Sequence, residues 1–279
     1  VHDYKGVTES EEVQRFMTWE ADNPCSIITS ITSARENARI IREVVSHEYW
    51  ERINFFYLWM QGDASHILYE RDRNEFYGQV RRINQLLFGV GEGTMSHGEP
   101  WEFFLLGKYL ERSCQTARIL DVKYHLLLPT PDLVGTPIDN AHWMAILKSC
   151  SGYEPFHKQR AGFEHGTQVA DFLIFELIFP RSVRSCLMEC REACRRIRRK
   201  GDDRNELERQ LDDMIDWLNL VGIDDLVAAG LHESLTRVVN AIHEMGSAVY
   251  RDYFEIPVER LAEMLTPTGS KQSQMQTSA

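Results

Sequence analysis

The chain has 279 residues and a formal net charge of −11, and 43% of its residues are hydrophobic and 26% charged. A chain of this composition can bury a core, which excludes an intrinsically disordered protein. Its longest apolar run, residues 53–60, is far shorter than the roughly 20 residues of a membrane-spanning helix. The excess of acidic residues argues against sequence-independent nucleic-acid binding, because such binding requires lysine and arginine to displace counterions.

The spacing of apolar residues predicts an all-α fold. Apolar residues recur every three or four positions between prolines and glycines, and no alternating strand pattern persists. Asn23 followed by Pro24 is typical of a helix start. The predicted helices span about 24–46, 47–61, 70–90, 99–128, 138–153, 167–178, 180–199, 203–220 and 228–254. We expect one helical domain at 1–265, followed by a disordered tail at 266–279 that lacks apolar periodicity.

An internal repeat indicates how the helices are organised. The sequence that starts at Phe16 resembles the sequence that starts at Phe172, an offset of 156 residues (172 − 16). This register pairs Glu20 with Glu176, Pro24 with Pro180, Ser26 with Ser182, Arg35-Glu36 with Arg191-Glu192, and Arg39 with Arg195. One register over separated segments predicts a duplication, in which two similar helical halves are related by a pseudo-twofold axis.

The repeated arginines allow two interpretations. Arg35, Arg39 and Arg42 share one face of a predicted helix, and Arg191 and Arg195 repeat the pattern. Like charges at this spacing repel, so anionic groups are expected nearby. Those groups are either acidic neighbours such as Glu36 and Glu192, or the carboxylate or phosphate of a ligand.

Three cysteines also share a helix face, and the residues aligned with them in the repeat indicate why small side chains are found there. Cys186, Cys190 and Cys194 align with Ser30, Ala34 and Ala38, all small residues. This favours a close helix crossing in which Cys acts as a small hydrophobe. Sulfurs spread about 6 Å apart per turn are poorly placed for one metal ion. The sequence also contains no Gly-rich nucleotide loop and only half of a di-iron motif, so we predict no cofactor.

The most distinctive segment, residues 93–125, carries candidate site residues. His97 and Glu99 open it, and the helix that follows contains Glu111, Arg112 and Arg118 among apolar residues at nearly every angle. Such a helix is expected to be buried, so its charges need partners or a polar pocket. Either Glu111 and Arg112 form ion pairs with the repeated Arg-Glu pairs, or they line a ligand pocket. Glu99 and Glu111 lie about 18 Å apart along a helix, so His97 and Glu111 can share a site only if the substrate is extended.

These segments resemble the alpha-E family, a bacterial all-helical family named for a Glu-Arg motif. The resemblance rests on TMSHGEPW, LGKYLERSCQTARILDVKYHLLL, DNPCSI, ARENAR, VGTPIDNAHW and DDLVAAGLHE, and covers about residues 10–255. It implies a partnership with circularly permuted ATP-grasp proteins or transglutaminase-like peptidases. Such partners imply a role in making, attaching or trimming a peptide or amide-linked product.

The family pattern begins with a first Glu-Arg helix of the type YWxxRxxERAE. At the repeat offset, the counterpart of Glu111 would lie upstream of Val1. We therefore expect this chain to lack a leading segment of the full protein.

Three functions stay open from the sequence. The first is a cytoplasmic accessory protein that binds an ATP-grasp-type ligase or a transglutaminase-like peptidase, together with a peptide-like anionic ligand. The second is an enzyme that acts on a peptide or amide through His97, Glu99, Glu111 and Arg112. The third is a structural scaffold. The expected site is a buried polar seam made of Arg35, Glu36, Arg39, His97, Glu99, Glu111, Arg112, Arg118, Arg191 and Glu192. Neither a membrane nor a nucleic acid is expected as a partner.

Overall fold

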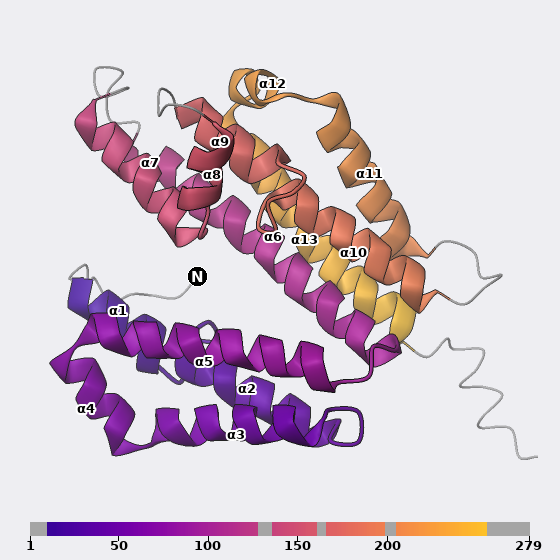
Figure 1. Ribbon diagram of the computed structural model, residues 1–279. Coiled ribbons are helices and arrows are strands. Elements are labelled where there is room, and N and C mark those ends of the chain that lie inside the picture. The colour runs from indigo at the N-terminus through magenta and orange to yellow at the C-terminus, as the bar shows by residue number, and fades with distance from the viewer. Residues whose placement is uncertain (1–9, 128–135, 161–165, 199–204, 256–279) are drawn as a thin grey trace, which may run out of the picture. The chain divides into compact units, whose positions relative to one another are not determined.

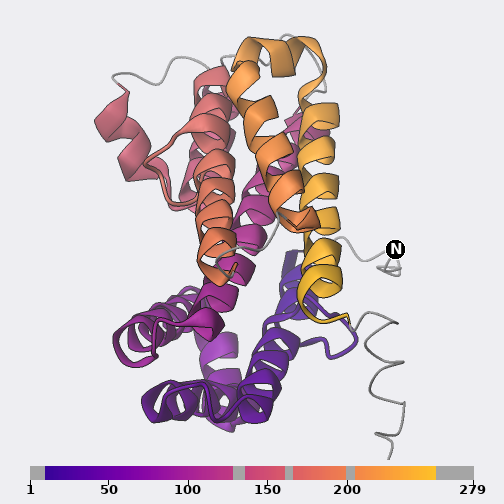
Figure 2. The same ribbon diagram turned by 90° about the vertical axis from the view of Figure 1, so that its right-hand side faces the viewer.

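The computed structural model describes residues 10–127, 136–160, 166–198 and 205–255 (Figures 1 and 2). All regular secondary structure within these ranges is helical, which confirms the all-α prediction. The predicted tail at 266–279 lies outside the described residues. Within the ranges described, no helix combines the length and hydropathy required to cross a membrane.

The helices form two compact units, residues 1–101 and 102–279, and the single domain expected at 1–265 stays a prediction. The first unit contains α1 (Ser10–Trp19), α2 (Ile27–Ile40), α3 (His47–Gln61), α4 (Asp63–Arg71) and α5 (Arg73–Thr94). The second contains almost all of α6 (Glu99–Leu127), then α7 (Pro137–Ser149), α8 (Tyr153–Gln159), α9 (Gly166–Phe175), α10 (Val183–Ile197), α11 (Glu206–Leu220), α12 (Ile223–Ala228) and α13 (Leu231–Tyr253). The short helices α1, α4, α8 and α12 were not predicted as separate elements.

The predicted start of α2 was wrong by three residues. Ser26, not Asn23, caps this helix, because its hydroxyl accepts the backbone N–H of Thr29. The side chain of Asn23 instead accepts the N–H of Cys25 and donates to the carbonyl of Phe16. These bonds fold residues 23–26 into a turn before the helix begins.

Helix boundaries repeat at the offset found in the sequence. Both ends of α1 and α9 differ by 156 residues, and so do the first residues of α2 and α10. Ser182 caps α10 as Ser26 caps α2, by accepting the N–H three residues on. In the first unit α2 packs on α3 and α3 on α5, and in the second α10 packs on α11 and α11 on α13. A duplication predicts this correspondence, and the duplication itself stays a prediction.

The core of the first unit is largely aromatic. Phe76 is completely buried, and its ring lies 5.6 Å from Trp59, 5.5 Å from Trp19 and 5.2 Å from Tyr69, centroid to centroid. These rings join α1, α3, α4 and α5. Aromatic pairs at such separations add to the free energy gained by burial.

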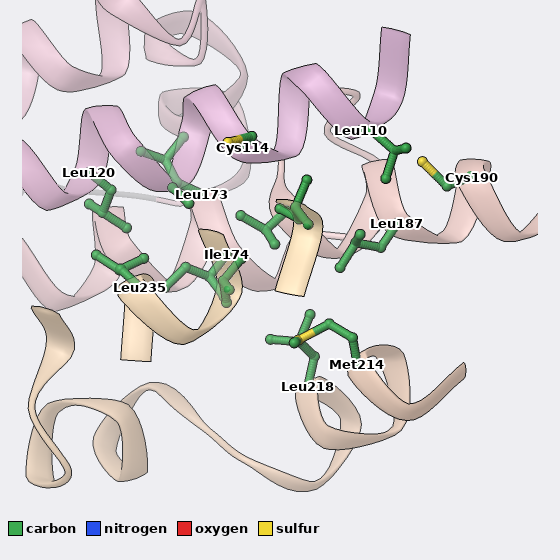
Figure 3. Close-up of a cluster of buried hydrophobic side chains, with 14 of the residues drawn as sticks. Leu110, Cys114, Leu120, Leu173, Ile174, Leu187, Cys190, Met214, Leu218 and Leu235 are labelled. Atoms are coloured by element: carbon green, nitrogen blue, oxygen red, sulfur yellow. The ribbon is translucent and has the colours of Figure 1, made fainter. Parts of the chain in front are cut away.

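The core of the second unit is formed by its long helices (Figure 3). Cys186, Cys190 and Cys194 are completely buried in it, and the Cys190 thiol lies 3.8 Å from the carbonyl oxygen of Leu106 in α6. Burial raises the pKa of both Cys186 and Cys194 to about 12, so these thiols stay protonated. This agrees with the interpretation of the cysteine face as a small apolar helix-packing surface.

Candidate functional site

Glu111 and Arg112 point to different sides of α6. Successive residues of an α-helix are rotated by about 100°, so two neighbours cannot lie on one face. Glu111 shares its face with Cys114 and Arg118, at three- and four-residue spacing, and this face borders α13. Arg112 shares its face with Lys108 and Thr116, and Thr116 contacts the residue before the cap of α10. The two residues of the motif therefore belong to two different environments.

The Glu111 face lines a groove between α6 and α13 with a volume of about 390 Å³. Its lining residues are Gly107, Leu110, Glu111, Cys114 and Arg118 of α6, and Ile242, His243, Gly246 and Ser247 of α13. Leu110, Cys114 and Ile242 are buried and form its floor, and the polar residues and both glycines are exposed. The groove is therefore an apolar trough bordered by polar groups, which is a common form of binding site.

Opposite charges lie along this groove. The Glu111 carboxylate accepts a hydrogen bond of 2.6 Å from the amide of Gln115, one turn away. Arg118 lies two turns from Glu111, about 10 Å along the helix. The groove therefore presents an anionic acceptor and a cationic donor group at different points along its length.

His243 is held in one tautomer. Its Nε2 atom lies 2.9 Å from an Nη atom of Arg118. A guanidinium group can only donate, so Nε2 must accept in this hydrogen bond, and Nδ1 is the ring nitrogen that carries the proton. Nδ1 is then the nitrogen that can donate to another group.

Cys114 approaches the same nitrogen from the floor of the groove. Its sulfur is 3.9 Å from Nε2 of His243, and the residue is 4% exposed. Burial, the largest cause, raises the pKa of the Cys114 thiol; Arg118 lowers it and Glu111 raises it further. A thiol with a raised pKa is a poor nucleophile at neutral pH, because the thiolate is the reactive form.

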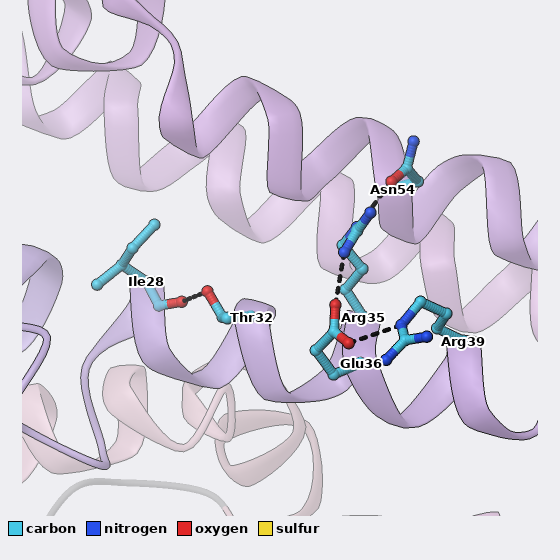
Figure 4. Close-up of polar contacts among 6 residues, drawn as sticks. All are labelled: Ile28, Thr32, Arg35, Glu36, Arg39 and Asn54. Atoms are coloured by element: carbon cyan, nitrogen blue, oxygen red, sulfur yellow. Dashed lines mark hydrogen bonds and ion pairs between the residues drawn. The ribbon is translucent and has the colours of Figure 1, made fainter.

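The arginine faces are paired with acidic neighbours. In the first unit Glu36 accepts hydrogen bonds from Arg35 at 2.6 Å and Arg39 at 2.7 Å, and Arg35 also reaches Asn54 of α3 (Figure 4). The hydrogen bond from Arg39 is the first cause that holds the pKa of the Glu36 carboxyl below its ordinary value. The guanidinium of Arg35 also lies over the ring of Tyr57, 4.7 Å from its centroid.

The second unit repeats this arrangement. Arg195 pairs with Glu192 at 2.7 Å, and Arg191 reaches Asp212 of α11 at 3.5 Å. The described ion pairs of Arg191 and Glu192 do not include Glu111. Within this unit Arg191 lies at the α10–α11 contact, Glu192 pairs with Arg195 of its own helix, and Glu111 lies at the α6–α13 groove, so the common seam stays a prediction. Their positions differ because each helix of a bundle contacts several neighbours with different faces.

His97 and Glu99 have local surroundings at the start of α6. His97 donates from Nε2 to the carbonyl of Glu92, near the end of α5, at 2.9 Å. Its ring stacks on Trp101, with centroids 4.6 Å apart. Glu99 is the exposed first residue of α6. Its negative charge interacts favourably with the partial positive charge at the N-terminus of the helix. These contacts account for both residues as parts of the α5–α6 connection.

Comparison with known proteins supplies the family. The Alpha-E family, described as a predicted alpha-helical domain with a conserved ER motif, matches residues 1–254. The chain belongs to the alpha-E family. No curated protein and no solved structure matches it. Glu111 and Arg112 are the alpha-E motif residues by the resemblance described above, and the structure of this alpha-E chain shows that they face different neighbours.

The α13 side of the groove in this alpha-E chain was not predicted from the sequence. His232 and His243 are 11 residues apart in the sequence, close to three helical turns, so both lie on one face of α13. His243 lies opposite Arg118, and His232 lies opposite Asp121 on the same pair of helices. The spacing of the two histidines indicates that they share a helix face. Only the packing of the helices shows that this face contacts α6.

The contact between His232 and Asp121 predicts a pH dependence. His232 donates from Nδ1 to the Asp121 carboxylate at 2.8 Å, and this hydrogen bond is the first cause that raises the pKa of His232. In the unfolded chain the pKa is about 6.5. The stabilisation is therefore fully present below pH ~6.5 and is lost as pH rises through the higher folded-state pKa.

We expect the denaturation midpoint in urea to fall between pH 6 and pH 8.5 by more in the native chain than in His232→Gln. The neutral amide of Gln has no proton to lose in this range, so the variant serves as the control. Identical pH profiles for both chains would contradict the assignment.

Proposed function

We propose that this alpha-E protein is a cytoplasmic accessory subunit of an ATP-grasp-linked system that makes or trims peptide or amide bonds. Its partner is an ATP-grasp-type ligase or a transglutaminase-like peptidase, as the family resemblance implies. Its six cysteines are all free thiols, as expected in a reducing compartment.

The α6–α13 groove is the proposed site for a peptide-like ligand. The observation that carries this proposal is that Glu111, Arg118 and His243 border one apolar trough. Each peptide unit has one N–H donor and one C=O acceptor, and a peptide end adds a full charge. Glu111 accepts from N–H or ammonium groups, and Arg118 donates to carbonyl or carboxylate groups. The exposed position of Glu111 beside a groove favours this proposal over a purely structural scaffold.

An enzyme is the second candidate, favoured by the contact of 3.9 Å between Cys114 and His243. In a Cys–His pair the histidine removes the thiol proton to generate the nucleophile. The unprotonated Nε2 of His243 is correctly placed for this transfer. However, Arg118 already uses this nitrogen and burial raises the pKa of the thiol, so we rank the binding function first.

Co-purification tests the proposal. The full-length protein, expressed with its neighbouring genes, is purified by a tag, and bound proteins and small molecules are identified by mass spectrometry. We expect a ligase or peptidase of the stated classes, and a peptide-like compound reduced at least tenfold in Glu111→Gln and Gly246→Ala. Gly246 is exposed within α13 and an added Cβ there would contact nothing, so alanine enters the groove without a clash.

Gly89→Ala is the matched control. It places the same methyl group into open space on α5, a helix of the other unit that contributes no residue to the groove. Alanine is favoured over glycine within a helix by about 1 kcal/mol, so neither variant should unfold. Absence of both classes of partner from a folded, well-expressed preparation would refute the accessory role. Hydrolysis of a peptide by the purified chain, lost in both Glu111→Gln and Cys114→Ser, would establish the enzyme instead.

A further inference from the structure

Two opposite charges border the α6–α13 groove without neutralising each other. Glu111 and Arg118 are both exposed, and they lie two helical turns apart on one face of α6. Within the described part of the chain neither forms an ion pair: Glu111 accepts a hydrogen bond from the amide of Gln115, and Arg118 donates to His243. A guanidinium group has five N–H donors, so the bond to His243 leaves others for a carboxylate. The groove therefore offers an anionic and a cationic group to a ligand.

The two helices run antiparallel, which fixes the order of the groups along the groove. Phe103, early in α6, contacts Tyr253 at the end of α13, with ring centroids 5.0 Å apart. Asp121, late in α6, bonds to His232 near the beginning of α13. The groove lies between these two contacts. Its anionic group is therefore nearer the end of α13, and its cationic group is nearer the beginning.

The walls and the floor of the groove differ in kind. Gly107 and Gly246 line it from the two helices, and a Cβ added at either position would meet no atom within 4 Å. The backbone of a ligand can therefore approach both helices closely at these glycines. Buried Leu110, Cys114 and Ile242 form the floor. Such a floor suits an apolar side chain, because an unpaired charge is costly to bury.

We propose that this groove binds short linear peptides of two or three residues whose two ends are both free. The amino end lies at Glu111, the carboxyl end lies at Arg118, and an apolar side chain lies on the floor between them. An extended chain spans about 3.3–3.6 Å per residue, so three residues cover the roughly 10 Å between the two charged positions. The groove volume of about 390 Å³ is near the lower end of the range for small-molecule sites, roughly 300–1,000 Å³.

This assignment rests on the proposed function of the groove and goes further, because it specifies the ends and the length of the ligand. Isothermal titration of the full chain tests it with Ala-Leu-Ala, the N-acetyl form of this tripeptide, its C-terminal amide, and the pentapeptide Ala-Ala-Leu-Ala-Ala. We expect saturable binding of the free tripeptide. Each block removes one charged end, and an extended pentapeptide is too long to place both ends on the two residues. These three probes should therefore bind at least tenfold more weakly.

Variants assign each end of the peptide to one residue. Glu111→Gln should weaken binding of the free tripeptide at least tenfold, and binding of its N-acetyl form less than threefold, because the blocked peptide has no ammonium group to lose. Arg118→Gln should have the same pair of effects on the free tripeptide and its amide. Glu244→Gln and Arg251→Gln are the matched controls, since each removes the same charge from an exposed residue of α13 that does not line the groove. Each control should change binding less than twofold.

The outcomes separate this assignment from the proposed function. Equally tight binding of the blocked or longer peptides, still weakened by Gly246→Ala, would overturn the selection of free ends and leave the groove as a peptide site. Equal losses in Glu111→Gln and Glu244→Gln would overturn the selection as well, because a general charge effect would then explain both. If no peptide saturates the folded chain, both the selection and the proposed groove ligand are wrong.

Discussion

Replacement of Lys123 by alanine is expected to lower the free energy of unfolding by about 3–5 kcal/mol. Lys123 of α6 forms an ion pair with Asp139 of α7, and the side chains are only 8% and 13% exposed. Its ammonium group also lies 5.0 Å from the ring centroid of Trp143. Removal of the cation takes an ion-pair partner away from the Asp139 carboxylate, which lies in a largely desolvated position, and that lost interaction causes most of the effect. Chemical denaturation monitored by circular dichroism measures the effect.

Two further variants separate the charge from the packing. Lys123→Met combined with Asp139→Asn removes both charges and keeps most of the volume, so we expect it to recover more than half of the lost stability. The exposed pair of Lys158 and Glu154 is the matched control, with side chains 72% and 74% exposed. Lys158→Ala should cost less than about 1 kcal/mol, as is usual for surface pairs. An equal loss in Lys123→Ala and Lys158→Ala would show that burial of the first pair has no energetic consequence.

Replacement of Phe172 by alanine is expected to lower the free energy of unfolding by a similar amount, about 3–5 kcal/mol. Phe172 is completely buried in α9, with its ring centroid 4.7 Å from Phe179 and 5.4 Å from Phe156. Gly152 also lies against this ring, since an added Cβ there would stand 3.3 Å from it. Alanine would remove most of these contacts and leave a cavity that the backbone cannot close. A folded domain is stable by only about 5–15 kcal/mol, so this loss is a large share of the total.

Phe55→Ala is the control for Phe172→Ala. Phe55 is 52% exposed on α3, and its removal creates no internal cavity. We expect a change of less than about 1 kcal/mol in the same denaturation experiment. A loss below 1 kcal/mol for Phe172→Ala would mean that the ring cluster is not packed as the structure describes.

The helix signals in the sequence were sufficient for the fold class and for most helices. Ser182 illustrates why: its hydroxyl caps α10 through a bond to the third residue on, which depends only on neighbours in the chain. Asn23 shows where prediction from neighbouring residues fails. Its side chain was free to cap a helix at Pro24, but a bond to the carbonyl of Phe16, seven residues earlier, gives it another role.

For the candidate site, too, the sequence determined some features and the tertiary structure determined others. Sequence alone determined that Glu111 and Arg112 lie on one long helix. Only the tertiary structure decided that Glu111 borders a groove with His243, and that the face of Arg112 carries Thr116, which bonds Arg181 just before α10. Local backbone bonds and side-chain periodicity are properties of nearby residues, so the chain itself specifies them. The neighbour that each helix face meets depends on how separate helices pack, and that choice is made by the whole core.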